Sequence, residues 1–398
     1  MAEFHACLAG RGLRMSINLI ENGAMEMNGA LYHNNVLDTV EALIPNPYNS
    51  CHAADLLELD NGDMLCCWFA GSDEGNADIS VVVARLKAGE SKWGEPVKVS
   101  DDPERSEQNP SMFLTPDGDI WLIYTAQISK NARPDAHSLQ STAVIRRKIS
   151  KDNGYTWGPT EDIFTREGSF CRQKIQVLSS GRWVFGNWIC FNDDTHYGSD
   201  ISVVHISDDK GATWRTVEFP NCRGRVHANL IEVAPGKLIA LFRSRSADNI
   251  YISHSDDNAE TWTEPVRTSL PNNNSSISAI KLASGTIAIA YNPVRGNDDP
   301  TITCWPRLRC PVAIALSDDN GESWDLARLI EPGDGFIGSL NDVNNKRYEY
   351  PVIMQAKDGT IRAAYSYANR KCVKYVVVTE DWVRGAVKAE KPQYNPTK

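Results

Sequence analysis

Short apolar runs alternate with turn residues along most of the chain. The first clear unit has an apolar run at residues 51–59, a turn at 60–63, a second run that ends at Ala70 and a third from Ile79 to Leu86. Runs of this length, bounded by Gly, Asp or Asn, are typical of strands joined in hairpins. The same plan recurs from Gln108, Phe170, Val226, Asn274 and Glu349 onward. The pattern predicts six units of antiparallel sheet and no helix longer than a turn or two.

A second repeat marks the end of the third strand in four of these units. The phrase Ser-x-Asp-x-Gly-x-Thr-Trp, with small variations, begins at Ser150, Ser207, Ser255 and Ser317. Asp bonds to nearby backbone and Gly accepts positive φ, so the phrase predicts a tight turn. The Trp that follows can fill the space between neighbouring sheets. A hairpin that returns about every 50 to 60 residues is typical of a β-propeller.

We therefore predict an all-β fold, a six-bladed β-propeller of four-stranded antiparallel sheets. Residues 16–47 precede the first unit, and we expect them to add the last strand to the sixth sheet. The alternative is a seven-bladed ring in which residues 16–47 and 383–398 form the extra blade. Residues 1–15 are expected to be a disordered extension and residues 16–398 a single domain.

Charge and composition narrow the classes of partner. The 398 residues carry a formal charge of −10 without any block of Lys or Arg, which argues against nucleic acid. No run of 18 apolar residues predicts a membrane span, and the N-terminus lacks the apolar core of a secretory signal, so we expect a cytoplasmic protein. The ten cysteines form no Cys-x-x-Cys pair and are expected to be reduced. No spacing of His, Cys or acidic residues predicts a metal site or a cofactor.

The starts of the first strands predict a pocket. In a propeller these strands run along the central axis with the same direction, so their first residues converge on one face. In this chain the converging positions are polar, aromatic or cationic. They are His52, Gln108, Asn109, Arg172, His227, Asn229, Asn274, Ser275 and Tyr350.

The repeated phrase and the unit plan resemble the sialidase superfamily, also called the BNR-repeat proteins, over about residues 45–385. That resemblance implies three arginines that hold a carboxylate, a Tyr nucleophile with a Glu partner, and an Asp acid. Tyr350 matches the Tyr, because it starts the last unit eight residues before Asp358-Gly359. Arg243 matches one arginine, and Arg309 matches another, with Arg307 as its runner-up.

Two positions depart from the sialidase pattern. His52 stands where the first arginine is expected, and His227 stands where the Glu partner is expected. The acid has no clear equivalent, although Glu74 and Asp78 lie in the corresponding loop. Hydrolysis by a sialidase mechanism is therefore in doubt from the sequence.

His, Tyr and Arg together suit the β-elimination of a uronic acid. Arg can bind the carboxylate, and a neutral His or a Tyr can remove the acidic C5 proton. Within the superfamily the chain also resembles propellers that act on the rhamnose–glucuronate linkage, some lyases and some histidine-dependent rhamnosidases. The resemblance rests on His52 and the phrases at residues 108–110, 225–229, 271–276 and 348–351.

The preferred hypothesis is a carbohydrate-active enzyme that cleaves the linkage to a terminal acidic sugar by elimination. His52, His227 and Tyr350 would transfer protons. Arg172, Arg243 and Arg309 would hold the carboxylate, while Gln108, Asn109 and Asn274 orient hydroxyls. One alternative is a sialidase-like exo-glycosidase with Tyr350 as nucleophile, His227 as its base and Glu74 or Asp78 as acid. Another is a non-catalytic propeller that binds glycans.

Overall fold

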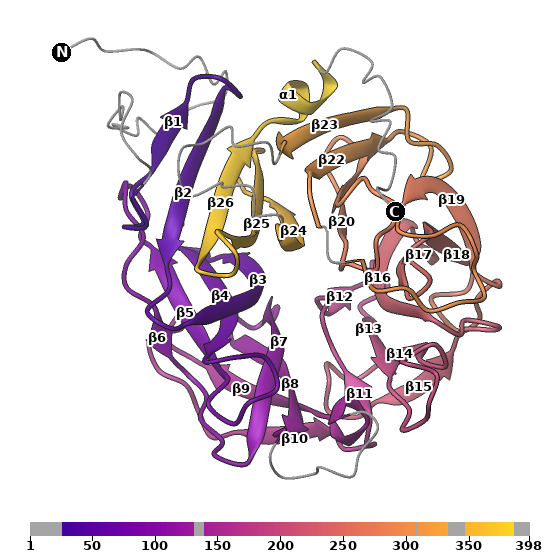
Figure 1. Ribbon diagram of the computed structural model, residues 1–398. Helices are drawn as coiled ribbons and strands as arrows, with labels where there is room; N and C mark the ends of the chain where they lie inside the picture. Colours follow the sequence, from indigo (N-terminus) through magenta and orange to yellow (C-terminus); the bar gives the residue numbers. More distant parts are fainter. Residues whose placement is uncertain (1–25, 131–138, 307–308, 333–346, 386–398) are drawn as a thin grey trace.

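The computed structural model describes residues 26–130, 139–306, 309–332 and 347–385. In these ranges the chain forms six antiparallel sheets that follow one another around a central axis, as Figure 1 shows. Helix in the described ranges is confined to α1 (Glu380–Arg384) and the 3-10 turn η1 (Leu139–Thr142). No helix of the described residues is long and apolar enough to cross a membrane. The all-β prediction is confirmed.

The first three sheets contain the strands from β3 to β15. Sheet I consists of β3 (Ser50–Glu58), β4 (Met64–Gly71), β5 (Ser80–Leu86) and β6 (Val97–Lys98). Sheet II consists of β7 (Arg105–Leu114), β8 (Ile120–Ile128), β9 (Val144–Ser150) and β10 (Glu161–Phe164). Sheet III consists of β11 (Ser169–Phe170), β12 (Gln176–Val177), β13 (Trp183–Ile189), β14 (Ile201–Ser207) and β15 (Arg215–Glu218).

The other three sheets contain the remaining strands. Sheet IV consists of β16 (Arg225–Ala234), β17 (Lys237–Ser244), β18 (Asn249–Ser255) and β19 (Val266–Pro271). Sheet V consists of β20 (Ser278–Lys281), β21 (Ile287–Tyr291), β22 (Val312–Ser317) and β23 (Leu326–Glu331). Sheet VI consists of β24 (Glu349–Gln355), β25 (Ile361–Tyr367), β26 (Cys372–Val378), β2 (Thr39–Pro45) and β1 (Tyr32–Asn34).

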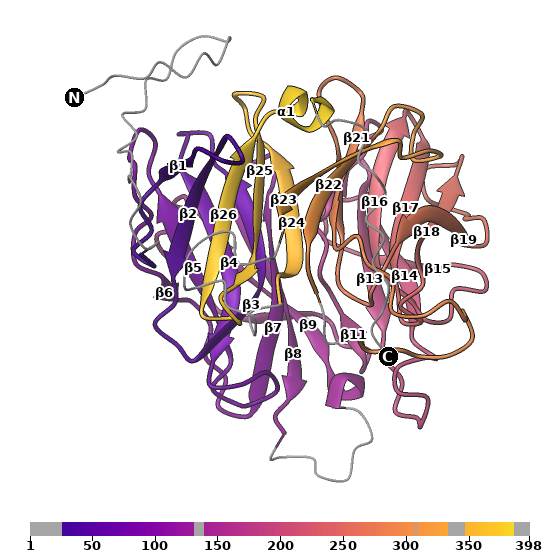
Figure 2. The same ribbon diagram turned by 45° about the horizontal axis from the view of Figure 1, so that its top comes forward.

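The N-terminal strands complete sheet VI, as the sequence predicted. β2 pairs antiparallel with β26 from Val40 opposite Val377 to Pro45 opposite Cys372. Figure 2 shows the indigo β2 beside the yellow β26. Sheet VI then returns to sheet I, because β24 contacts β3. The first and last parts of the chain are therefore joined by a hydrogen-bonded ladder.

A buried ion cluster reinforces this junction. Lys374 Nζ on β26 lies 2.9 Å from Glu41 Oε2 on β2 and 2.9 Å from Glu331 Oε2 on β23. All three side chains are fully buried. Breaking one partner of such a cluster leaves an uncompensated buried charge, which costs about 3–5 kcal/mol. The cluster thus ties the N-terminal strand to both sheet V and sheet VI.

The repeated Trp lies between sheets, as predicted. Six of the hydrophobic clusters each join two neighbouring sheets and include one Trp that follows a third strand. These residues are Trp93, Trp157, Trp214, Trp262, Trp324 and Trp382. Trp93 and Trp382 come from the two units that lack the full phrase, so the packing role is kept where the phrase has been lost.

The repeated phrase forms the predicted turn after the third strand. In the second copy, Ser207 Oγ donates to Asp209 Oδ1, and Asp209 accepts from both the amide and the hydroxyl of Thr213. Gly211 adopts a φ of 81° and donates its amide to Ser207 Oγ. The same bonds recur around Asp152, Asp257 and Asp319. Each turn closes on its own residues and needs no partner from another sheet.

Candidate active site

The inner strands share a bulge that places the candidate residues. Register shifts interrupt the pairing of β3, β7, β16 and β24 with their neighbours, next to a non-glycine residue with positive φ. The residues with this backbone at the axis are Ala53, Asn109, His227, Asn274 and Tyr350. Positive φ is unfavourable for a bulky side chain and costs about 1–3 kcal/mol, so surrounding contacts must hold it. Bulges of this kind redirect side chains next to functional sites.

Arg243 joins three of the predicted residues. Its Nη1 donates to the hydroxyl of Tyr350 at 2.6 Å and to Nε2 of His227 at 3.1 Å. Its Nε donates to Asn274 Oδ1 at 2.8 Å. The sequence predicted that these residues converge, and they do. Tyr350 is 8% exposed, more than the other three, so it is the member of the cluster that is most accessible to solvent.

Three guanidinium groups surround the Tyr350 ring. The guanidinium carbons of Arg243, Arg309 and Arg172 lie 5.4, 5.6 and 5.7 Å from the ring centroid. Burial of Tyr350 raises its pKa, but the charges of Arg243 and Arg309 outweigh that and bring the pKa below its ordinary value. Burial also lowers the pKa of Arg243 to about 9, although Tyr350 opposes this shift. The arrangement favours an ionised phenol.

His227 is held as a neutral imidazole. Its ring stacks on Trp188 with centroids 4.1 Å apart, and its Nδ1 lies 2.9 Å from Ser276 Oγ. A guanidinium can only donate, so the bond from Arg243 assigns Nε2 as the acceptor and the proton to Nδ1. Burial, followed by the charge of Arg243, lowers the pKa of His227 well below its usual range.

His52 lies on the other side of Tyr350. The two ring centroids are 4.1 Å apart, and His52 Nδ1 lies 3.0 Å from Ser366 Oγ and 3.6 Å from Glu349 Oε2. Burial and the charge of Arg370 lower the pKa of His52 well below its usual range, even though Glu349 opposes the shift. Both predicted histidines are therefore neutral and both face Tyr350.

Glu349 organises a set of cations that the sequence only partly predicted. Its carboxylate accepts from Arg309 Nη1 at 2.9 Å and from Arg347 Nε at 3.2 Å, and it also accepts from Arg370 Nε. Arg370 Nη1 continues to Glu74 Oε2 at 2.7 Å. Burial raises the pKa of Glu349, but Arg309 and Arg370 outweigh burial and hold it well below its usual range.

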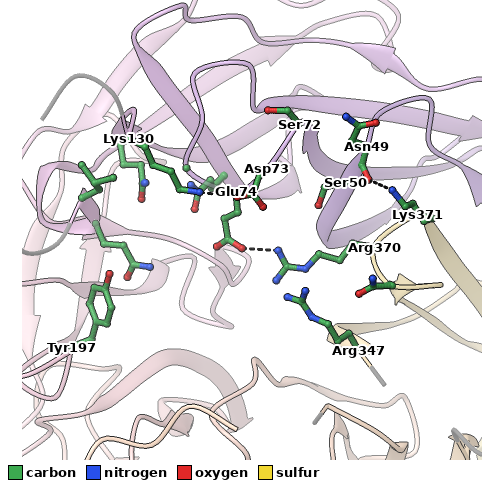
Figure 3. A pocket seen from close by; sticks show the side chains of 16 residues that line it. Asn49, Ser50, Ser72, Asp73, Glu74, Lys130, Tyr197, Arg347, Arg370 and Lys371 are labelled. Carbon is green, nitrogen blue, oxygen red and sulfur yellow. Dashed lines mark hydrogen bonds and ion pairs between the residues drawn. The ribbon is translucent and has the colours of Figure 1, made fainter. Parts of the chain in front are cut away.

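A cavity of about 720 Å³ opens beside this set of charges. Figure 3 shows Glu74 facing Arg370, with Arg347 beside Arg370 and Tyr197 across the cavity. Of the predicted binding residues, Gln108 lines the cavity. The described lining residues are Asn49, Ser50, Ser72, Asp73, Glu74, Gly75, Gln108, Gln127, Lys130, Leu139, Gln140, Tyr197, Arg347, Asn369, Arg370 and Lys371.

The two candidate acids occupy different places. Glu74 lines the cavity, whereas Asp78 accepts from the amide and the hydroxyl of Ser72 and so fixes the loop. Of the two, Glu74 is the carboxyl group that can reach a ligand in the cavity.

Comparison with known proteins decides the family. The model of the BNR repeat-like domain matches residues 62–363. The chain belongs to the BNR repeat-like family. A search of curated proteins found no match.

Solved structures that resemble this BNR repeat-like protein include sialidases. The Hadza microbial sialidase Hz136 is 16% identical with a TM-score of 0.70, and the match covers 87% of this chain and 70% of that one. The NanB sialidase from Streptococcus pneumoniae is 13% identical with a TM-score of 0.66, over 85% and 70% of the two chains. The intramolecular trans-sialidase from Ruminococcus gnavus is 13% identical with a TM-score of 0.66, over 85% and 96%. The family match confirms the predicted membership of the BNR-repeat proteins, and the solved structures confirm the sialidase-like fold, which at these identities is all that they show.

The other predicted residues of this BNR repeat-like protein make hydrogen bonds to groups other than the Tyr350 hydroxyl. Gln108 Nε2 donates to Ser106 Oγ at 2.9 Å, and the carbonyl of Asn109 accepts from Cys171 Sγ at 3.7 Å. Arg172 Nη2 donates to two main-chain carbonyls, those of Ala54 at 2.9 Å and Tyr350 at 3.2 Å. Arg307, the runner-up to Arg309, lies outside the described residues.

Sequence reasoning missed the roles of Glu349 and Arg370. Glu349 directly precedes Tyr350, and a carboxylate beside a buried Tyr on an inner strand was the available signal. Arg370 lies in the turn between β25 and β26, where Ala368, Asn369 and Arg370 all have positive φ. That turn lacks the repeated phrase, so no pattern in the sequence placed its Arg at the axis.

Proposed function

We propose that this protein cleaves the glycosidic bond of a terminal sugar that carries a carboxylate, with Tyr350 as the reactive group. The observation that carries the proposal is the 2.6 Å bond from Arg243 to the Tyr350 hydroxyl, among three guanidinium groups. A phenol is a weak nucleophile and a weak base until it ionises, and neighbouring cations favour the ionised form.

The charge of the site supports an anionic substrate. Arg172 Nε and Arg243 Nη2 are buried and have no hydrogen-bond partner among the described residues. A buried donor without a partner costs about 1–3 kcal/mol, and a carboxylate would provide a charge-assisted acceptor. We therefore assign the carboxylate of the sugar to this pair, with Arg309 contributing charge. The sialidases among the solved structures of this fold support an acidic sugar as the substrate class.

In the reaction that we favour, the Tyr350 phenolate attacks the anomeric carbon. The bond from that carbon to the leaving oxygen breaks, and the leaving oxygen takes a proton for which Glu74 is the candidate donor. Water then cleaves the glycosyl–tyrosine bond and restores the phenolate. His227 and His52 both pack against the ring, and because both are neutral they add no positive charge to that of the arginines.

Elimination at a uronic acid is the second candidate, favoured by the neutral His227 at the place where a sialidase has a carboxylate. The phenolate would take the C5 proton, the C4–O bond would break and a C4–C5 double bond would form. The phenol so formed would pass its proton to the leaving oxygen and return to the phenolate. The product would then be an unsaturated uronate that absorbs in the ultraviolet.

One set of assays tests both reactions. Methylumbelliferyl glycosides of sialic acid and glucuronic acid are incubated with the wild type and with Tyr350→Phe. We expect dye release that Tyr350→Phe abolishes, together with a glycosyl adduct on Tyr350 in mass spectra of the trapped enzyme. Uronate disaccharides are tested in parallel, and ultraviolet absorbance without a glycosyl adduct would select elimination. Turnover that survives Tyr350→Phe, or no turnover on any acidic sugar, would overturn the proposal and leave a glycan-binding protein.

We also infer that the six sheets are the blades of one six-bladed propeller. The ladder between β2 and β26 and the contact between β24 and β3 support this count. The site then lies at the axis, on the face where the inner strands start.

A further inference from the structure

Sheet III differs from the other sheets at the central axis. Its inner edge is split into β11 and β12, and residues 171–175 between them belong to neither strand. Within this gap, Arg172, Gln173 and Lys174 follow one another, and we call them the central tripeptide. Arg172 and Gln173 are buried, at 3% and 8% exposure. Figure 1 shows the break between β11 and β12 facing the inner strands of the other sheets.

The side chains of the central tripeptide donate to main-chain carbonyls of all five other sheets or the segments that lead into them. The acceptors are Ala54 and Leu56 on β3, Met112 on β7, His227 on β16, Ile277 directly before β20, and Tyr350 on β24. A bulge interrupts a ladder and leaves carbonyls without their usual partners. Arg172 and Gln173 supply such partners to the bulge carbonyls of Ala54, His227 and Tyr350. The same segment also reaches three carbonyls outside the bulges, those of Leu56, Met112 and Ile277.

Gln173 holds the two segments that meet at His227. Its Nε2 donates to the carbonyl of Ile277 at 2.9 Å and lies 3.4 Å from the carbonyl of His227. Ile277 follows Ser276, whose hydroxyl lies 2.9 Å from His227 Nδ1. One amide group therefore bridges the main chains on both sides of the His227–Ser276 bond.

Lys174 provides an internal contrast. Its Nζ pairs with Asp55 Oδ2 at 2.6 Å and donates to the carbonyls of Leu56 and Met112. These partners belong to sheets I and II and do not touch His227. Lys174 thus lies next to Gln173 and, like Gln173, donates to main-chain carbonyls, but its partners do not lead to the imidazole of His227.

We propose that Gln173 is a positioning residue that fixes the orientation and tautomer of His227. It fixes the Ile277 carbonyl to which the Ser276 hydroxyl donates, so that Ser276 Oγ accepts from Nδ1 while Arg243 donates to Nε2. The same Nη1 group of Arg243 that donates to Nε2 also donates to the Tyr350 hydroxyl, so the orientation of His227 helps to aim it. The catalytic consequence rests on the proposed function, whereas the tautomer of His227 does not depend on it.

The test compares Gln173→Met, Gln173→Glu and the matched control Lys174→Met. Both Gln173 variants remove the donor, and Glu keeps a polar side chain in case Met impairs folding. Ring nitrogen shifts from ¹⁵N NMR of histidine-labelled protein report the tautomer of His227. We expect the Nδ1–H tautomer in the wild type and in Lys174→Met, and its loss in both Gln173 variants.

Kinetics provide the second readout. We expect kcat to fall by up to about 100-fold in the Gln173 variants while KM changes by less than about three-fold, because misplacement near the reacting atoms affects turnover more than binding. Lys174→Met should lower the melting temperature and keep kcat. A Gln173 variant that keeps the Nδ1–H tautomer, or equal losses in Lys174→Met, would overturn the inference. Activity that survives in Tyr350→Phe would overturn the proposed function alone, and the tautomer result would still decide the role of Gln173.

Discussion

Two backbone features recur in this molecule, the turns after the third strands and the bulges of the inner strands. They differ in what is repeated from one sheet to the next. The turns after the third strands repeat their side chains, because the Asp of each phrase makes the same local bonds in all four copies. The bulges of the inner strands repeat only their backbone, because the residue with positive φ is Ala53, Asn109, His227 or Tyr350. The first kind of position therefore serves the fold, whereas the second presents different side chains to one axis on a shared backbone.

The largest effect should come from breaking the bulge cluster at Arg243. We expect Arg243→Met to lower kcat/KM by about 1,000-fold, equivalent to about 4 kcal/mol of transition-state stabilisation. The same change removes the charge that most strongly favours the Tyr350 phenolate. The pKa of Tyr350 should therefore rise, because less positive charge remains to offset the effect of burial. Steady-state kinetics and an ultraviolet titration of tyrosinate, with Tyr350→Phe as the reference, measure both effects.

The matched control is an arginine at the other end of a sheet. Arg182 donates to Asp208 in the second phrase at 2.7 Å and to Glu260 in the third at 2.6 Å. Arg182→Met should keep kcat/KM within about two-fold, since exposed ion pairs contribute at most about 1 kcal/mol and only to stability. Equal losses in the two variants would show that the bulge cluster has no special part in turnover.

The fold was predictable because its determinants are local and repeated. Alternating apolar runs and the four phrases placed the strands and the turns after β9, β14, β18 and β22, and Trp93 and Trp382 marked the two degraded units. The pairing of β2 with β26 was expected because the sixth unit lacked a strand. The buried cluster of Lys374, Glu41 and Glu331 was not predicted, since its members lie far apart in the sequence and share no pattern.

The site was predictable only where it follows the repeat. Counting from the turns located His227, Arg243 and Tyr350, which the structure brings into contact. It did not locate Arg370, because the turn between β25 and β26 carries no phrase, and it did not give Arg172 its main-chain partners. Contacts that cross the axis join sheets that lie far apart in the sequence, and no local pattern encodes them.

The second prediction breaks a repeated position. Trp262 packs in the cluster between sheets III and IV, 4.8 Å from Phe219 between ring centroids, and donates Nε1 to the carbonyl of Ala259. We expect Trp262→Ala to lower the free energy of unfolding by about 3 kcal/mol, because it leaves a cavity between two sheets. Urea denaturation measures the loss. The kcat of the folded enzyme should stay within about two-fold. A large fall in kcat without unfolding would contradict the idea that the repeated turns support stability and the bulges support turnover.

The third prediction concerns the loss of stability in acid. The folded-state pKa values of His52 and His227 are both well below the ordinary value of 6.5. Just below pH 6.5, therefore, these histidines bind protons in the unfolded chain but not in the folded protein. The free energy of unfolding should therefore fall as pH drops below 6.5, by up to about 1.4 kcal/mol per pH unit for each histidine. Urea denaturation between pH 7 and 5.5 should show a smaller fall in His227→Gln than in the wild type.

His205 sharpens this third prediction. It lies on β14 outside the site, and burial lowers its pKa to about 3. His205→Gln should reduce the acid sensitivity as much as His227→Gln, whereas only His227→Gln should reduce kcat. An equal reduction of kcat in both variants would mean that histidine burial, rather than position at the bulge, governs turnover.

The smallest effect should follow from weakening one repeated turn. Asp319 accepts from the Ser317 hydroxyl at 2.7 Å and from the amide and hydroxyl of Ser323 at 2.9 and 2.5 Å. Asp319→Asn keeps the shape of the side chain but removes its charge and one acceptor. Because the turn is exposed to solvent, we expect a loss of at most about 1 kcal/mol at pH 7 and unchanged kcat.

The pH dependence of this loss identifies its cause. Burial raises the pKa of Asp319 slightly, but the bonds from Ser323 and Ser317 outweigh it and hold the pKa below 3.8 in the folded state. A depressed carboxyl pKa stabilises the fold above the unfolded value of 3.8, and that contribution is lost as pH falls below 3.8 through the lower folded pKa. The difference between the wild type and Asp319→Asn should therefore shrink in acid, as measured by melting temperature. A difference that stays constant as pH falls through this window would assign the loss to backbone geometry rather than to the carboxylate, and the repeated Asp would then be conserving a shape and not a charge.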